Sequence, residues 1–133
     1  MAHRRKAGKA KMEPVLILKT SLVVLSIAAM GGVLMAGFRF VRNINPPSWL
    51  AMLHGLLAGS ALTLLLYAYF TVGLPAFASW ALLLLLVAAA GGAFLNLNYH
   101  AKSLPLPKNI VLIHGAMAAM GYVLLLVAVF GPR

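Results

Sequence analysis

Long runs of apolar residues, separated by short polar stretches, divide most of the chain into four segments. These runs cover residues 15–41, 48–71, 76–99 and 108–130. As an α-helix that rises about 1.5 Å per residue, each run is long enough to cross a hydrocarbon core of roughly 30 Å. Every break contains proline, which cannot continue a helix but suits the start of the next one. The pattern predicts an all-α protein, a bundle of four transmembrane helices running up, down, up and down.

The pattern of the first two segments returns 60 positions later in the last two. When residues 22–70 are compared with residues 82–130 without a gap, 15 of the 49 pairs are identical. The identities include an Ala-Ala-x-Gly-Gly element and a His-Gly pair in each half. These elements are Ala28 to Gly32 with Ala88 to Gly92, and His54-Gly55 with His114-Gly115. We therefore expect a tandem-duplicated helical hairpin.

Three regions follow from this repeat. Residues 1–13 form a basic cytoplasmic tail, residues 14–72 the first transmembrane hairpin and residues 73–133 the second. Five of the eleven Lys and Arg residues precede the first long apolar run, Lys19 lies near its start, and Arg133 lies at the same side of the predicted bundle. Because cytoplasmic segments are enriched in Lys and Arg, both termini are expected in the cytoplasm, with the tail beside anionic lipid headgroups. The basic residues lack interleaved aromatic residues, so we expect no binding to nucleic acid.

Composition excludes several classes of function. With 63% hydrophobic and 9% charged residues, so short a chain cannot hide its apolar side chains in a soluble globule, so its expected surroundings are a lipid bilayer. It has no cysteine for a thiolate site, and Glu13, the one acidic residue, precedes the first span. No intramembrane carboxylate is therefore available for a proton relay or for acid-base hydrolysis. A self-contained hydrolase and an ion-coupled pump are both disfavoured.

The two repeated histidines are the candidate site, because ionisable side chains within a bilayer are costly. Each follows a proline by seven residues, which places both about 10 Å below the same membrane face. Two imidazoles from facing helices are able to bind one iron from opposite sides, which predicts one haem b. The expected haem-binding residues are His54 and His114 as axial iron ligands, Gly31, Gly32, Gly91 and Gly92 beside the macrocycle, Gly55 and Gly115 beside the ligands, and Arg39, Arg42, Lys102 and Lys108 near the propionates.

Other interpretations of these residues remain open. Small residues at intervals of four also favour close helix packing in lipid, and a membrane histidine can be satisfied by a hydrogen bond to a neighbouring helix. His100 breaks the repeat and is expected at the interface, where it could reach a propionate or replace one ligand. A copper site or a His/Met haem is a further alternative. The methionines near the histidines are Met35, Met52, Met117 and Met120.

The histidine pair and the small-residue gaps resemble those of the small four-helix b-type cytochromes of bacterial membranes. This resemblance implies an electron-transfer subunit, rather than a self-contained enzyme, that serves a redox partner, a larger membrane complex or a quinone. The Leu-His-Gly and Leu-Pro-Leu-Pro-Lys stretches look like those of bacterial membrane proteins, which implies the bacterial inner membrane. The family often carries more than two ligating histidines, whereas two suffice here for one haem. The alternative is a non-catalytic membrane accessory or assembly subunit without a cofactor.

Overall fold

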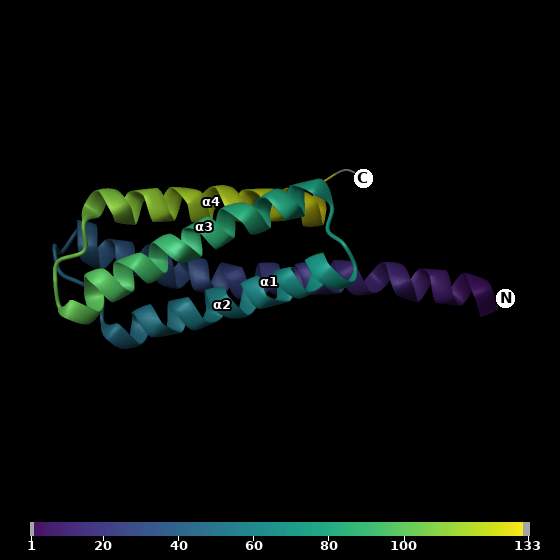
Figure 1. The fold of residues 1–133 in the computed structure, drawn as a ribbon, viewed down its shortest axis with the longest axis horizontal. Coiled ribbons are helices and arrows are strands. Elements are labelled where there is room, and N and C mark those ends of the chain that lie inside the picture. Colours follow the sequence, from purple (N-terminus) through teal and green to yellow (C-terminus); the bar gives the residue numbers. More distant parts are fainter. Residues whose placement is uncertain (1, 132–133) are drawn as a thin grey trace.

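The computed structural model describes residues 2–131, with side chains from residue 14 onward, and it is an all-α bundle (Figure 1). The basic side chains of the tail and Arg133 lie outside this description. A single-turn 3-10 helix follows α3. The elements are α1 (Ala2–Phe40), α2 (Ser48–Thr71), α3 (Ala76–Asn98), η1 (His100–Lys102) and α4 (Lys108–Phe130).

The predicted segments coincide with these helices except at three ends, and one of them is the end of α1, which lies at Phe40 instead of residue 41. Helix α1 begins at Ala2 instead of near residue 15 and continues through Pro14, whereas α3 ends at Asn98, one residue early. Helices α2, α3 and α4 each start directly after a proline in extended conformation, which fixes its own φ and lacks an N–H that the helix would leave unpaired. All four helices are long and apolar enough to span a bilayer, so this is a multi-pass membrane protein.

The helices are antiparallel, and their connections define the two ends of the bundle (Figure 1). The α1–α2 and α3–α4 connections lie together at one end, here called the loop side. The start of α1 and the end of α4 lie at the other, here called the termini side. Helix α1 packs mainly on α2 and α3 mainly on α4, while α1–α4 and α2–α3 contacts join the two hairpins. Helices α2 and α4 therefore occupy diagonal corners.

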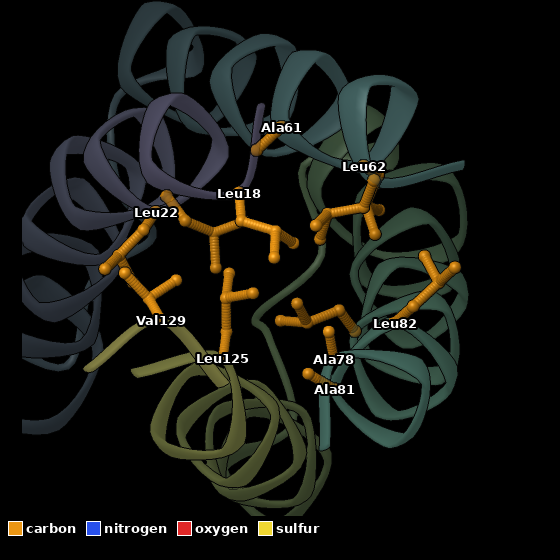
Figure 2. Close-up of a cluster of buried hydrophobic side chains, with 12 residues drawn as sticks. Leu18, Leu22, Ala61, Leu62, Ala78, Ala81, Leu82, Leu125 and Val129 are labelled. Atoms are coloured by element: carbon orange, nitrogen blue, oxygen red, sulfur yellow. The ribbon is translucent and has the colours of Figure 1, made fainter. Parts of the chain in front are cut away.

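The termini-side half holds the packed apolar core. Figure 2 shows Leu18, Leu62 and Leu125 converging from three helices between the four ribbons. Leu65 and Leu125, which correspond at the 60-residue offset, are both 0% exposed. The same offset pairs several other members of the core: Leu18 with Ala78, Leu22 with Leu82, and Leu25 with Leu85. The two hairpins thus bury equivalent positions, although the duplication itself stays a prediction.

The loop-side half is filled less completely. Four helical stretches there contain no fully buried residue: 29–40 of α1, 51–60 of α2, 89–94 of α3 and 108–120 of α4. The two repeated histidines and the paired glycines, which the sequence singled out, lie in these stretches. The bundle is thus packed by leucine and alanine at one end and lined by imidazole and glycine toward the other.

Candidate functional site

The two repeated histidines meet inside the loop-side half. His54 and His114 each lie near the start of their helices, α2 and α4, and both side chains are half-buried. Their ring centroids are 6.2 Å apart, and the ring planes are inclined by 78°. Because α2 and α4 occupy diagonal corners, the rings approach each other across the middle of the bundle.

Each imidazole is held by a hydrogen bond to the other helix of its own hairpin. Nδ1 of His54 lies 2.8 Å from the carbonyl oxygen of Ala28 on α1, and Nδ1 of His114 lies 2.8 Å from that of Ala88 on α3. A carbonyl only accepts hydrogen bonds, so Nδ1 is the donor in both rings. In a neutral imidazole, the lone pair is then on Nε2, which is the atom available to a metal.

The paired glycines lie against these same rings. A Cβ atom added at Gly32 would lie 3.2 Å from Cε1 of His54, and one added at Gly92 would lie 3.0 Å from Cε1 of His114. Gly31 and Gly91 face the Cβ atoms of the two histidines at 3.8 and 3.9 Å. The space that the glycines leave is therefore occupied by the imidazoles, and their contact with a macrocycle stays a prediction.

The glycines that follow the histidines face outward. Gly55 and Gly115 are exposed, and a Cβ atom added at either would meet nothing within 4 Å. They lie on the lipid-facing sides of α2 and α4, so they do not line the space between the rings. Gly59 also meets nothing within 4 Å, and Ala119 is exposed.

The four basic residues expected near propionates lie at the loop-side end of the bundle. Arg39 donates a hydrogen bond from Nε to the carbonyl of Leu106. The cationic groups of Arg42 and Lys108 lie over aromatic rings of α1, at 5.8 Å from the ring centroids of Phe38 and Phe40. Lys102 is exposed in the α3–α4 connection. All four therefore sit on the face nearer the histidines.

His100 links the two loop-side connections and does not join the histidine pair in the described contacts. Its Nε2 lies 2.8 Å from the carbonyl oxygen of Pro46, so that atom donates. Asn45 makes a second link, because it donates to the carbonyl of Leu104 and accepts from the amide of Leu106. The local pattern gave no sign of these bonds, since they join loops that are more than 50 residues apart.

Among the His, Cys, Asp and Glu side chains of the described residues, the structure brings together the two imidazoles of His54 and His114. No group of three or more His, Cys, Asp or Glu side chains gathers there to hold a metal ion. Of the four methionines considered for copper, Met52 and Met120 are 66% and 57% exposed and so point toward lipid, whereas Met35 and Met117 are half-buried. Two imidazoles alone do not complete the coordination of a metal ion, so a metal bound to both would need further donors.

The fold and the site define a four-helix transmembrane bundle with a diagonal pair of histidines at one depth. No family model, curated protein or solved structure matches this chain. Its function is therefore inferred from the geometry of the site.

Proposed function

We propose that the protein is a membrane b-type cytochrome, an electron-transfer subunit that holds one haem between α2 and α4. Nε2 of His54 and Nε2 of His114 would bind its iron. The observation that carries this proposal is the pair of rings 6.2 Å apart, each with Nδ1 already engaged by a backbone carbonyl. Metal-ligating histidines commonly donate their second N–H to such a carbonyl.

The spacing and the number of donors both fit a haem. Two imidazoles bound on opposite sides of one metal, through bonds of about 2.0 Å, would have ring centroids roughly 6 Å apart, and the separation here is 6.2 Å. Two protein ligands leave a bare metal ion short of donors, whereas a porphyrin supplies its own ring nitrogens.

The basic residues near the histidines support the same proposal. Arg39, Arg42, Lys102 and Lys108 are cations at the loop-side end, where propionates would need partners. A bound haem supplies reversible one-electron transfer, and this chain contributes the axial ligands and their orientation. We place the protein in a bacterial inner membrane with both termini in the cytoplasm, which sets the haem toward the outer face. A redox partner, a larger membrane complex or a quinone then exchanges electrons with it.

The test is an absorption spectrum of the detergent-solubilised protein, expressed with adequate haem. We expect a Soret band and a sharp α-band on reduction, both lost in His54→Ala and in His114→Ala. His100→Ala serves as the control, because this histidine bonds to Pro46 outside the pair, so the bands should persist. Monodisperse elution of each variant shows that it is folded. A folded, colourless wild type would contradict the proposal.

A second candidate is a cofactor-free accessory or assembly subunit of a larger complex. Two observations favour it. The hydrogen bonds from Nδ1 to backbone carbonyls give one nitrogen of each imidazole a partner within the protein. Small residues are exposed to lipid at positions 55, 59, 115 and 119. Small residues on a lipid-facing helix allow close approach of another helix. This candidate predicts that His54→Gln and His114→Gln retain function and that the protein co-purifies with a partner in a colourless state.

A further inference from the structure

We propose that Gly32 and Gly92 are positioning residues for the two imidazoles. The lack of a side chain at each position lets one ring dock on a helix carbonyl, which selects the Nδ1–H tautomer and leaves Nε2 without a proton. This inference deepens the proposed function and rests on it only in naming Nε2 as the ligand atom. The docking itself is a property of the polypeptide alone.

Helix geometry explains why the glycine lies four residues after the acceptor. In an α-helix the carbonyl of one residue points toward the amide four residues later, and the side chain at that later position leans back over the preceding turn. Residue 32 is four after Ala28, and residue 92 is four after Ala88. A side chain at either position would cover the acceptor that the histidine uses. Glycine leaves that carbonyl open to a partner from the neighbouring helix.

The contacts separate the two members of each glycine pair. A Cβ atom at Gly92 would meet Cε1, Nδ1 and Nε2 of His114 at 3.0, 3.5 and 3.7 Å, and one at Gly32 would meet Cε1 and Nδ1 of His54 at 3.2 and 3.5 Å. At Gly31 and Gly91 the shortest contacts are 3.8 and 3.9 Å, an ordinary van der Waals distance. An added Cβ would therefore crowd the ring only at the second glycine of each pair, and the shortest of these contacts is at Gly92.

The docked ring has a defined chemical consequence. A neutral imidazole exists as two tautomers, and which nitrogen carries the proton is set by the hydrogen bond of the other. The carbonyls of Ala28 and Ala88 accept only, so each docked ring is protonated on Nδ1. A ring pushed away from its carbonyl loses this selection, and Nε2 is then protonated in part of the molecules.

The experiment is ¹⁵N NMR of full-length protein in detergent micelles with labelled histidine. Single His→Gln variants assign the signals. In the wild type we expect both rings of the pair to show protonated Nδ1 and unprotonated Nε2. In Gly92→Ala the two nitrogen shifts of His114 should move toward each other while those of His54 stay unchanged. Gly32→Ala should cause a smaller shift, at His54, and it is the second test variant if Gly92→Ala does not fold.

The matched controls are Gly91→Ala and Gly31→Ala, which add the same methyl group one residue away and should leave both rings unchanged. The inference would be overturned by a wild type in which Nε2 is protonated. It would also be overturned if folded Gly92→Ala showed the same ¹⁵N shifts of His114 as Gly91→Ala. Haem content provides the separate arm: we expect Gly92→Ala to retain severalfold less haem than Gly91→Ala. A colourless wild type with the expected tautomers contradicts the cytochrome proposal alone, while unaltered tautomers in Gly92→Ala contradict the positioning role whether or not haem binds.

Discussion

The two halves of the bundle differ in how completely their side chains are buried and in which contacts join their helices. On the termini side, leucines and alanines are buried to completion, and Leu65, Leu125 and Ala61 are 0% exposed. On the loop side, long stretches of all four helices bury no residue fully, and the interhelical contacts include the bonds of His54 and His114 to carbonyls. Where the candidate site lies, polar bonds between helices add to the packing of a few buried residues such as Leu50 and Leu95.

The difference between the two halves indicates how a small membrane bundle combines a polar site with a stable fold. In lipid, helix association depends on van der Waals packing and on interhelical hydrogen bonds. The termini-side core supplies mainly the first, with one hydrogen bond between Ser26 and Tyr122 beside it. The loop side uses the second, and the links of Arg39, Asn45 and His100 close the connections beyond the histidines. The site is therefore bounded by a packed core on one side and by bonded loops on the other.

The largest expected effect on stability comes from the packed half. Leu125→Ala should lower the free energy of unfolding by about 2 kcal/mol, because it removes van der Waals contacts at a position that is 0% exposed. Denaturation in mixed micelles measures this change. Leu56→Ala, at a position 67% exposed to lipid, is the control and should have little effect. Equal losses for both variants would remove the distinction between core and lipid-facing positions.

A smaller loss is expected from overpacking the α3–α4 contact. A Cβ atom at Gly121 would lie 2.8 Å from Cγ of Leu85 and 3.2 Å from the backbone oxygen of Ala81. Gly121→Ala should therefore lower the free energy of unfolding by about 1 kcal/mol, since α3 and α4 must move apart. Gly115→Ala adds the same methyl group to α4 where nothing lies within 4 Å, so it should be neutral or slightly stabilising. If Gly121→Ala were as stable as Gly115→Ala, the contact between α3 and α4 would be able to accept the extra methyl group without loss of stability.

The smallest effect tests the polar contact between the hairpins. The hydroxyl oxygens of Tyr122 on α4 and Ser26 on α1 are 2.8 Å apart, and Ser26 also donates to the carbonyl of Leu22. Tyr122→Phe removes this bond and should cost about 0.6 kcal/mol, an average value for such bonds between transmembrane helices. The same denaturation assay applies, with Tyr67→Phe on exposed α2 surface as the control. A loss above about 2 kcal/mol would place this bond among the main contributors to stability.

The sequence predicted the helices well because apolar length and proline are local signals. The bounds of α2 and α4 were predicted to the residue, and the all-α four-helix bundle is confirmed. The start of α1 was wrong because the polar residues before Pro14 give no apolar run, yet the helix continues through them. The expected proximity of His54 and His114 agrees with their 6.2 Å separation, since equal depth and facing helices follow from the repeat. Their role as ligands stays a prediction.

What the sequence did not predict depends on backbone atoms or on distant loops. The acceptors of the two histidines are carbonyls of Ala28 and Ala88, and a carbonyl is common to every residue. The Ala-Ala-x-Gly-Gly element was visible, but its meaning required the distance from Gly92 to the ring. The partner of His100 is the carbonyl of Pro46, 54 positions away, which no local periodicity encodes.

The carbonyl bonds also set the order in which the protein can be assembled during synthesis. Each bond spans 26 residues and joins the two helices of one hairpin, so His54 can be oriented once α1 and α2 are inserted. The meeting of the two rings, in contrast, requires helices from both hairpins. A nascent chain therefore exposes one prepared imidazole before its counterpart exists. Delivery of any molecule that bridges the rings must follow the insertion of α4.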